Sequence, residues 1–117
     1  MTTITLKLPW PPTANTYWRR HGSTYFISKR GMEYRNLVQV ACSQYRNQFP
    51  KEQRLEVLIE AYPPDRRRRD LDNLFKSLLD ALQKATVYFD DSQIDKLTIW
   101  RCIPYEGLLV VTIANLD

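Results

Sequence analysis

Apolar and polar residues alternate strictly in two parts of the chain, and this is the pattern of a strand with one buried face. Residues 3–8, TITLKL, alternate in this way and are followed by PWPP, where proline cannot continue a ladder of hydrogen bonds. Residues 55–62, LEVLIEAY, alternate again and end at two prolines. Residues 23–27, STYFI, are a weaker strand candidate. The pattern therefore predicts three strands before residue 63.

Two other segments repeat apolar residues at the spacing of a helix. Ser28 can cap a first helix, which we expect to run to about Phe49. Its expected buried face consists of Tyr34, Leu37, Val38, Ala41 and Tyr45. A second helix is expected from about Asp72 to Ala85. Its expected buried stripe consists of Leu71, Leu74, Phe75, Leu78 and Leu82.

The end of the chain predicts two more strands. Residues 95–103, DKLTIWRCI, and residues 107–115, GLLVVTIAN, are joined by PYEG, which is typical of a hairpin with glycine at its end. Residues 89–93, FDDSQ, are expected to be a loop. The order β-β-α-β-α-β-β favours the α+β class, with a mixed sheet and two main helices on one of its faces. We expect a single small domain over residues 1–117, because no segment has the composition of a linker.

Composition narrows the class of partner without deciding it. The chain has 17 lysines and arginines against 13 acidic residues, a net charge of +4 that permits a nucleic-acid partner. Cys42 and Cys102 have no metal-type spacing and are expected to be free thiols. No apolar run reaches the length of a membrane span, and the N-terminus lacks the pattern of a signal peptide. We therefore expect a cytoplasmic protein with no membrane association.

The candidate chemistry lies in residues 63–76, PPDRRRRDLDNLFK, where four arginines precede two closely spaced aspartates. If residues 70–72 are extended, Asp70 and Asp72 point to the same side and repel unless a cation lies between them. Ligands that are all oxygen suit Mg²⁺. A third acid is expected from Asp91, in the loop after the second helix. A helix of about 14 residues is roughly 21 Å long, so the following strand must return along it to bring Asp91 close.

Basic and amide side chains surround these aspartates in the sequence. Lys76 lies four residues after Asp72 and can steady a phosphate or the charge that develops on a leaving oxygen. Asn73 lies on the same first turn. Phosphate contacts, which do not read sequence, are expected from Arg66, Arg67, Arg68 and Arg69, with Arg19, Arg20 and His21 of the N-terminal loop extending the basic surface.

Each of these features also has a simple structural interpretation. Asp72 can be a helix N-cap, and Lys76 can form a surface ion pair with Asp72 or Asp80. The arginine run can be a solvated face, and Asp90 with Asp91 can be only a turn. Taken singly, the structural interpretations are preferred. The arginines, the two aspartates, the asparagine and the lysine nevertheless occur together within 11 residues. This combination makes a metal-dependent phosphodiester site as well supported as the structural interpretations.

Three stretches together resemble one family. LPWPPTANTYWR, PPDRRRRDLDNLFKSLLDAL and FDDSQI are similar, in order and separation, to the RusA family of Holliday-junction resolvases, over nearly the whole chain. The resemblance implies a RusA-like fold and a homodimeric endonuclease of DNA recombination and repair, often encoded by a phage or prophage. Such an enzyme uses Mg²⁺, with Mn²⁺ as a substitute, to resolve four-way DNA junctions by paired symmetric nicks that leave a 5′-phosphate and a 3′-hydroxyl.

The resemblance also implies roles for particular residues. The catalytic and metal-binding acids are Asp70, Asp72 and Asp91, and the catalytic lysine is Lys76. Arg69 and Asn73 match the DNA-binding part of the motif. Two alternatives stay open at this point. One is a catalytically silent module that binds branched DNA, and the other is a nuclease for flaps or replication forks.

Overall fold

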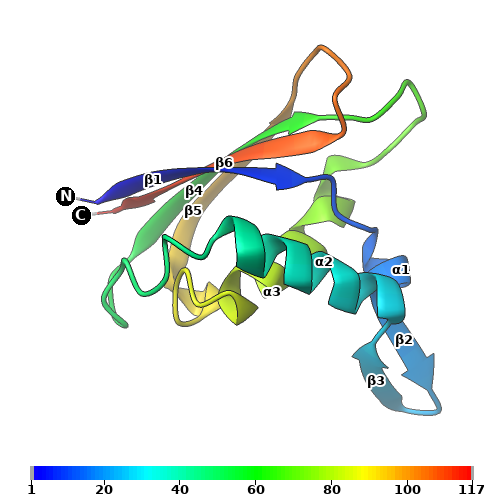
Figure 1. The fold of residues 1–117 in the computed structure, drawn as a ribbon, viewed down its shortest axis with the longest axis horizontal. Coiled ribbons are helices and arrows are strands. Elements are labelled where there is room, and N and C mark those ends of the chain that lie inside the picture. The colour runs from blue at the N-terminus through cyan, green and yellow to red at the C-terminus, as the bar shows by residue number, and fades with distance from the viewer. Residues whose placement is uncertain (1, 117) are drawn as a thin grey trace.

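The computed structural model describes residues 2–116, and its centre is a four-stranded sheet (Figure 1). The strands are β1 (Thr3–Pro9), β4 (Leu55–Tyr62), β5 (Ile94–Arg101) and β6 (Leu108–Asn115), and they lie in the order β1-β6-β4-β5. Strands β4 and β5 are parallel, whereas β6 is antiparallel to both β1 and β4. The sheet is therefore mixed, and the α+β class expected from the sequence is confirmed.

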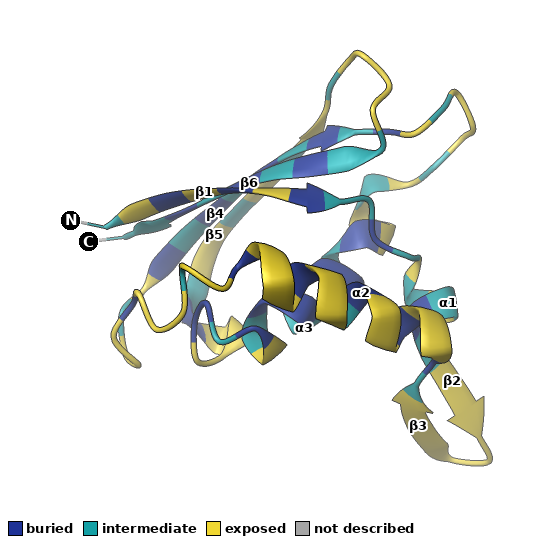
Figure 2. Cartoon of the chain, in the orientation of Figure 1, coloured by how far each residue is buried: buried dark blue, intermediate teal, exposed yellow. Residues whose placement is uncertain are grey.

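One face of the sheet forms the core. Alternate residues of β1, β4 and β6 are buried, as the period of two requires of a strand with one covered face. Two main helices, α2 (Lys29–Ala41) and α3 (Phe75–Lys84), lie on that face, while no helix of residues 2–116 lies on the opposite face (Figure 1). Both helices turn buried residues to the sheet and exposed residues away from it (Figure 2).

Helix α2 begins where the sequence predicts and ends earlier. The Ser28 hydroxyl accepts a hydrogen bond of 3.0 Å from the backbone of Gly31, which confirms the predicted cap. The helix ends at Ala41 rather than near Phe49, because residues 42–49 form turns that fasten to the loop after α3. There the backbone N–H of Asn47 donates to the Thr86 carbonyl at 2.8 Å. The segment after the helix is thus held against the loop after α3 instead of continuing as helix.

The buried face of α2 differs from the predicted one. Leu37 is 56% exposed, and Ala41 is also exposed, although both were expected inside. The residues turned inward are Gly31, Tyr34, Val38 and Cys42. A Cβ atom on Gly31 would lie 2.5 Å from the Tyr17 carbonyl oxygen, so α2 can approach the preceding segment only with glycine there. That close approach sets the rotation of the helix.

The second predicted helix consists of two parts. A 3₁₀ helix, η1 (Leu71–Leu74), leads directly into α3. The expected stripe is confirmed: Leu74, Leu78 and Leu82 are buried, and Leu71 and Phe75 are half-buried. A further short 3₁₀ helix, η2 (Asp91–Gln93), precedes β5.

The predicted hairpin between the last two strands is wrong. Strand β4 lies between β5 and β6, so these two strands do not pair. Their connection crosses the end of β4, where the backbone N–H of Cys102 donates to the Ala61 carbonyl at 2.8 Å and that of Gly107, with φ +70°, donates to Pro63 at 3.3 Å. Alternate residues of β6, which are Leu109, Val111 and Ile113, are buried in the core, and the other residues of the strand are half-buried.

The N-terminal segment forms an element that periodicity did not reveal. After β1, a single helical turn α1 (Ala14–Tyr17) leads into a hairpin of β2 (Trp18–His21) and β3 (Thr24–Ile27). Strand β3 confirms the weaker strand candidate. The hairpin projects from the main body and is largely exposed (Figure 2). Among residues 2–116, no helix is long and apolar enough to cross a membrane.

Candidate active site

Asp70 and Asp72 lie at the start of η1, in the connection between β4 and α3. Asp70 has extended backbone angles, but residues 71–74 are already 3₁₀-helical, so the expected extended segment over 70–72 does not form. Both residues are exposed. Neither carboxylate accepts a hydrogen bond or forms an ion pair with another residue in the described range. The N-cap interpretation of Asp72 therefore fails, and both carboxylates are available to a ligand.

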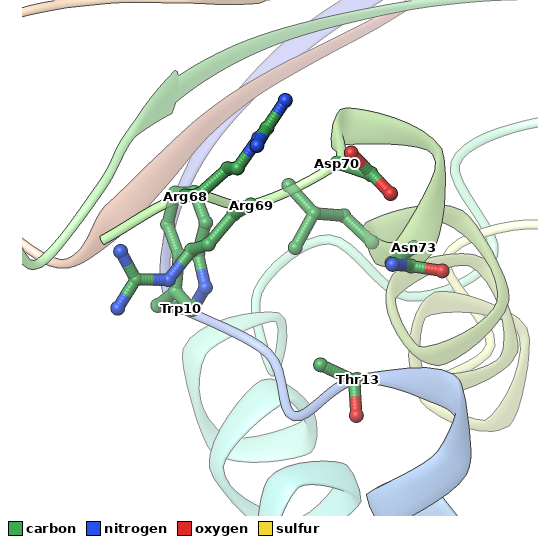
Figure 3. Close-up of a pocket in the computed structure, with 7 residues that line it drawn as sticks. Trp10, Thr13, Arg68, Arg69, Asp70 and Asn73 are labelled. Carbon is green, nitrogen blue, oxygen red and sulfur yellow. The ribbon is translucent and has the colours of Figure 1, made fainter. Parts of the chain in front are cut away.

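Asp70 lines a first pocket of about 470 Å³. Figure 3 shows its position between the segment that follows β1 and the segment that leads into η1. Asp70 and Asn73 lie on one side, while the Arg69 guanidinium lies next to Trp10 on the other and Arg68 points away from Asp70. The lining residues are Trp10, Thr13, Arg68, Arg69, Asp70, Asn73 and Leu74. The structure thus brings together one candidate acid, the amide of Asn73 and half of the arginine run.

The four arginines are not equivalent. Arg66, Arg67 and Arg68 are exposed, and Arg67 makes only a loose contact of 3.9 Å with Asp65. Arg69 donates to the Asp65 carboxylate at 2.7 Å, and its guanidinium lies 5.9 Å from the centre of the Trp10 ring. The hydrogen bond from Arg69 is the largest cause that holds the pKa of Asp65 below its ordinary value. Arg69 is therefore partly a structural residue.

A second, more open pocket of about 1000 Å³ lies between α3 and the β2–β3 hairpin. It brings together four of the predicted site residues, Arg19, Arg20, Lys76 and Asp91. The other lining residues are Ala14, Asn15, Trp18, Tyr25, Phe75, Leu79 and Asp80. Within residues 2–116, Lys76 forms no ion pair, so the interpretation as a surface pair with Asp72 or Asp80 is not supported.

Asp90 and Asp91 have different surroundings. The Asp90 side chain accepts from the backbone N–H of Ser92, and the Gln93 side chain accepts from the backbone of Asp90 at 3.0 Å, which is a capping box for η2. The Tyr88 hydroxyl donates to Asp91 at 2.8 Å. Partial burial raises the pKa of Asp91, and nearby Asp80 and Asp90 add to the rise while Tyr88 opposes it. Asp90 is thus a turn residue, as expected, and Asp91 is the acid that faces the pocket.

The structure does not bring the three candidate acids into one group. Asp70 lines the first pocket, Asp91 lines the second, and Asp72 lines neither. Over the described range, no three acidic, histidine or cysteine side chains are close enough together to hold a metal ion. Helix α3 lies between these acids in the sequence. Asp70 and Asp72 precede its N-terminal end, and Asp91 follows its C-terminal end. The sequence predicted that the strand after α3 would run back along the helix and bring Asp91 close to Asp72. Asp91 precedes β5 (Ile94–Arg101), so that strand does not bring it there.

Sequence reasoning missed a cluster behind the second pocket. The Tyr17 hydroxyl donates to Asp80, and Arg35 Nε lies 2.9 Å from both the Tyr17 hydroxyl and the Asp80 carboxylate. Burial is the largest cause that raises the pKa of Tyr17. These residues join α1, α2 and α3 and so fix the hairpin relative to Lys76. They are far apart in the sequence and follow no motif, so no local signal could have found them.

Comparison with known proteins places this architecture in a family. The sequence model of the family described as Endodeoxyribonuclease RusA matches residues 9–114. This chain belongs to the RusA family. The matched range contains both pockets and every candidate site residue, and the predicted resemblance is confirmed.

Curated relatives support the same assignment to the RusA family. A protein of Enterobacteria phage HK97 named crossover junction endodeoxyribonuclease rusA is 45% identical over 100 residues, covering 86% of this chain and 83% of that protein. Proteins named crossover junction endodeoxyribonuclease RusA from Shigella sonnei and from Escherichia coli K12 are 37% and 36% identical, each covering 99% of this chain and 98% of its own length. The prediction of an endonuclease, with relatives encoded by phages, is confirmed at the level of the family.

Proposed function

We propose that this protein is a Mg²⁺-dependent endonuclease that resolves four-way DNA junctions by paired symmetric nicks and works as a homodimer in DNA recombination and repair. The observation that supports it most is the pair of uncompensated carboxylates, Asp70 and Asp72, directly after a run of exposed arginines. A module that only binds DNA has no use for free carboxylates beside phosphates, since they would repel the ligand. The names of the relatives support a junction as the substrate.

Asp70, Asp72 and Asp91 would hold a divalent cation, although among residues 2–116 these carboxylates form no group of three and Asp70 and Asp91 line different pockets. This assignment rests on the type of donor and not on the geometry, because all three ligands are oxygen and the first two carboxylates have no competing partner within residues 2–116. Mn²⁺ accepts the same ligands and should substitute. When bound, the ion supplies Lewis acidity toward phosphodiester oxygens and favours ionisation of water.

The basic residues lie on both sides of this region. Arg66, Arg67 and Arg68 would contact phosphates next to the first pocket, while Arg19 and Arg20 would do so at the second. These contacts hold the strand in register without reading its sequence. Asn73 would donate from its amide to a phosphate or sugar oxygen beside Asp70.

Lys76 would act on the reacting phosphate. Its ammonium group has no ion-pair partner in the described part of the chain and lines the same pocket as Asp91. A cation in this position stabilises the negative charge that develops on the leaving oxygen as the bond breaks.

The homodimer follows from the reaction rather than from an observed interface. Resolution of a four-way junction needs two nicks in strands of like polarity, placed symmetrically about the crossover. The chain carries only one set of candidate acids, so a two-fold pair of chains supplies the second site in the required orientation.

The test compares a four-way junction, a replication fork and a linear duplex, each with Mg²⁺ and with chelator. We expect paired nicks in the junction only when Mg²⁺ is present. Asp70→Asn, Asp72→Asn and Asp91→Asn should each abolish cleavage and retain binding, because asparagine keeps the size but removes the charge that a cation needs. Glu52→Gln is the matched control and should cleave normally, because the Glu52 carboxylate is exposed, lies outside both pockets and forms no ion pair within residues 2–116.

Four outcomes would contradict parts of the proposal. Binding without cleavage in Mg²⁺ or Mn²⁺ would favour the silent module, and faster cutting of the fork would favour a fork nuclease. A variant of Asp70, Asp72 or Asp91 that cuts at the wild-type rate would remove that residue from the site. A mixed dimer of wild-type and Asp72→Asn chains should nick only one strand of a cruciform, and two cuts by that species would exclude one site per subunit.

A further inference from the structure

The β2–β3 hairpin carries aromatic rings on the face that lines the second pocket. In its antiparallel register Trp18 lies opposite Ile27, and Arg20 lies opposite Tyr25. Because side chains alternate between the two faces of a strand, Trp18, Arg20 and Tyr25 share one face, and Phe26 lies on the other. Trp18, Arg20 and Tyr25 line the second pocket, whereas Phe26 does not. Arg19, which pairs opposite Phe26, also lines the pocket, so both faces of β2 contribute to it while the aromatic rings come from one face.

The two rings of this face are held in place by cations. The Arg20 guanidinium lies 5.7 Å from the centre of the Tyr25 ring, and the Arg35 guanidinium lies 5.6 Å from that of Trp18. Trp18 also packs edge-to-face against Tyr17, with ring centres 5.2 Å apart. Tyr25 nevertheless remains 65% exposed. An aromatic ring that is oriented by a cation and still open to solvent is a preformed surface for stacking.

A third ring and a polar rim complete the pocket. Phe75, at the start of α3, is half-buried against the core and also lines the pocket, and the amide of Asn15 offers both a donor and an acceptor. At about 1000 Å³ the pocket is at the upper end of the range of roughly 300–1,000 Å³ for small-ligand sites. Aromatic rings combined with arginines are the composition with which proteins bind single-stranded nucleic acid, the rings stacking on bases and the arginines on phosphates.

We propose that this pocket binds one unstacked nucleotide of the DNA branch point, with its base against the rings of Trp18, Tyr25 and Phe75. The inference rests on the proposed function, which supplies branched DNA as the ligand. In an intact duplex, bases present only their edges in the grooves, so ring faces become available only where stacking is broken. Unstacking costs least where pairing is already interrupted, which makes the branch point of a junction the favoured source.

This assignment connects junction selectivity to the candidate chemistry. Lys76 and Asp91 line the same pocket as the three rings, so a nucleotide bound there places its neighbouring phosphate beside them. Arg19 and Arg20 lie on the hairpin and would contact the flanking phosphates. A linear duplex cannot fill the pocket without losing stacking, so it would bind through the arginines without seating a phosphate at Lys76.

The experiment replaces one base at the crossover of a four-way junction with 2-aminopurine, whose emission changes when it leaves the base stack. Binding is measured in chelator, so the readout does not depend on cleavage. Wild-type protein should change the emission of the junction and not that of a linear duplex carrying the same base. Tyr25→Ala should lose the change and weaken junction binding by about fivefold or more, as expected for one base–aromatic stack.

Two variants make the test specific to the ring in the pocket. Tyr25→Phe keeps the ring and should restore both emission change and affinity. Phe26→Ala removes a 49% exposed ring from the opposite face of the same hairpin and should behave as wild type. Because Tyr25 is largely exposed, its substitution leaves the core intact.

The outcomes separate this inference from the proposed function. If wild-type protein cleaves the junction in Mg²⁺ but leaves the emission unchanged on binding, the inference is wrong and the proposed function stands. Equal losses for Tyr25→Ala and Phe26→Ala would assign the effect to the hairpin as a whole and would also overturn it. If wild-type protein neither binds nor cleaves the junction, both fail.

Discussion

Neutralising Arg66, Arg67 and Arg68 together should flatten the salt dependence of junction binding by nearly three units on a log–log plot. Each phosphate that a cation neutralises adds about 0.9 to the slope, so removal of three such cations lowers the slope by about 2.7. Over the range from about 50 to 200 mM salt, that difference corresponds to roughly 40-fold in affinity. The triple Arg→Gln variant should therefore bind more weakly at low salt, and between about 50 and 200 mM salt its affinity should fall roughly 40-fold less than that of the wild type.

The structure supplies the number of free cations. Arg66 and Arg68 make no hydrogen bond or ion pair with another described residue, and the Arg67 side chain is 84% exposed. Arg69 differs, because its side chain is 24% exposed and is paired with Asp65 at 2.7 Å. Arg69→Gln should therefore remove less than one unit of slope, while also loosening the segment that it joins to Asp65.

The assay is fluorescence anisotropy of a labelled junction in chelator, titrated with protein at several salt concentrations. Lys51→Gln is the matched control for a single arginine, since Lys51 is an exposed cation outside both pockets. Arg67→Gln should reduce the slope by about 0.9 and Lys51→Gln should leave it unchanged. An unchanged slope in the triple variant would show that DNA binds elsewhere. An equal effect of Lys51→Gln would show that net charge, rather than these particular arginines, sets the affinity.

Three further predictions concern single side chains. Lys76→Ala should lower the single-turnover cleavage rate by about 10²–10³ with little change in junction affinity, and an unchanged rate would remove Lys76 from the site. Asp80→Asn should lower the free energy of unfolding, measured in urea, by about 2–3 kcal/mol. This loss is smaller than for a fully buried ion pair, because the side chains of Arg35 and Asp80 are 17% and 21% exposed. An unchanged free energy of unfolding would show that Arg35 needs no counter-charge. Asp90→Asn should retain most cleavage, because asparagine caps a helix as well as aspartate does; full loss would make Asp90 a ligand.

Local physical rules determined much of this protein before any tertiary contact is considered. Alternation of apolar and polar residues located β1 and β4, and the spacing of leucines located α3 with its buried stripe. Ser28 marked the start of α2, because an N-cap depends only on residues within one turn. The acidic and basic motif over residues 66–76 is likewise contiguous, so its chemistry can be proposed from the sequence alone.

Tertiary packing decided the features that depend on residues far apart in the chain. The pairing of β6 with β4 and β1, instead of with β5, follows from competition among strands for the central positions, which a turn signal such as PYEG does not report. Helix α2 ends where residues 42–49 fasten to the loop after α3, and Gly31 sets its rotation by its close approach to Tyr17. Local propensity is weak beside such packing.

The candidate site also depends partly on local sequence and partly on the tertiary fold. The sequence identified Asp70, Asp72, Lys76 and the arginines, because they lie in one motif, but it could not place them in space. Only the fold put Asp70 and Asp91 in separate pockets and brought the N-terminal hairpin against α3. The Tyr17–Arg35–Asp80 cluster that holds this arrangement joins three segments whose separation in the chain reaches 63 residues. The identity of a side chain is local, but its neighbours are set by how the whole chain buries its apolar surface.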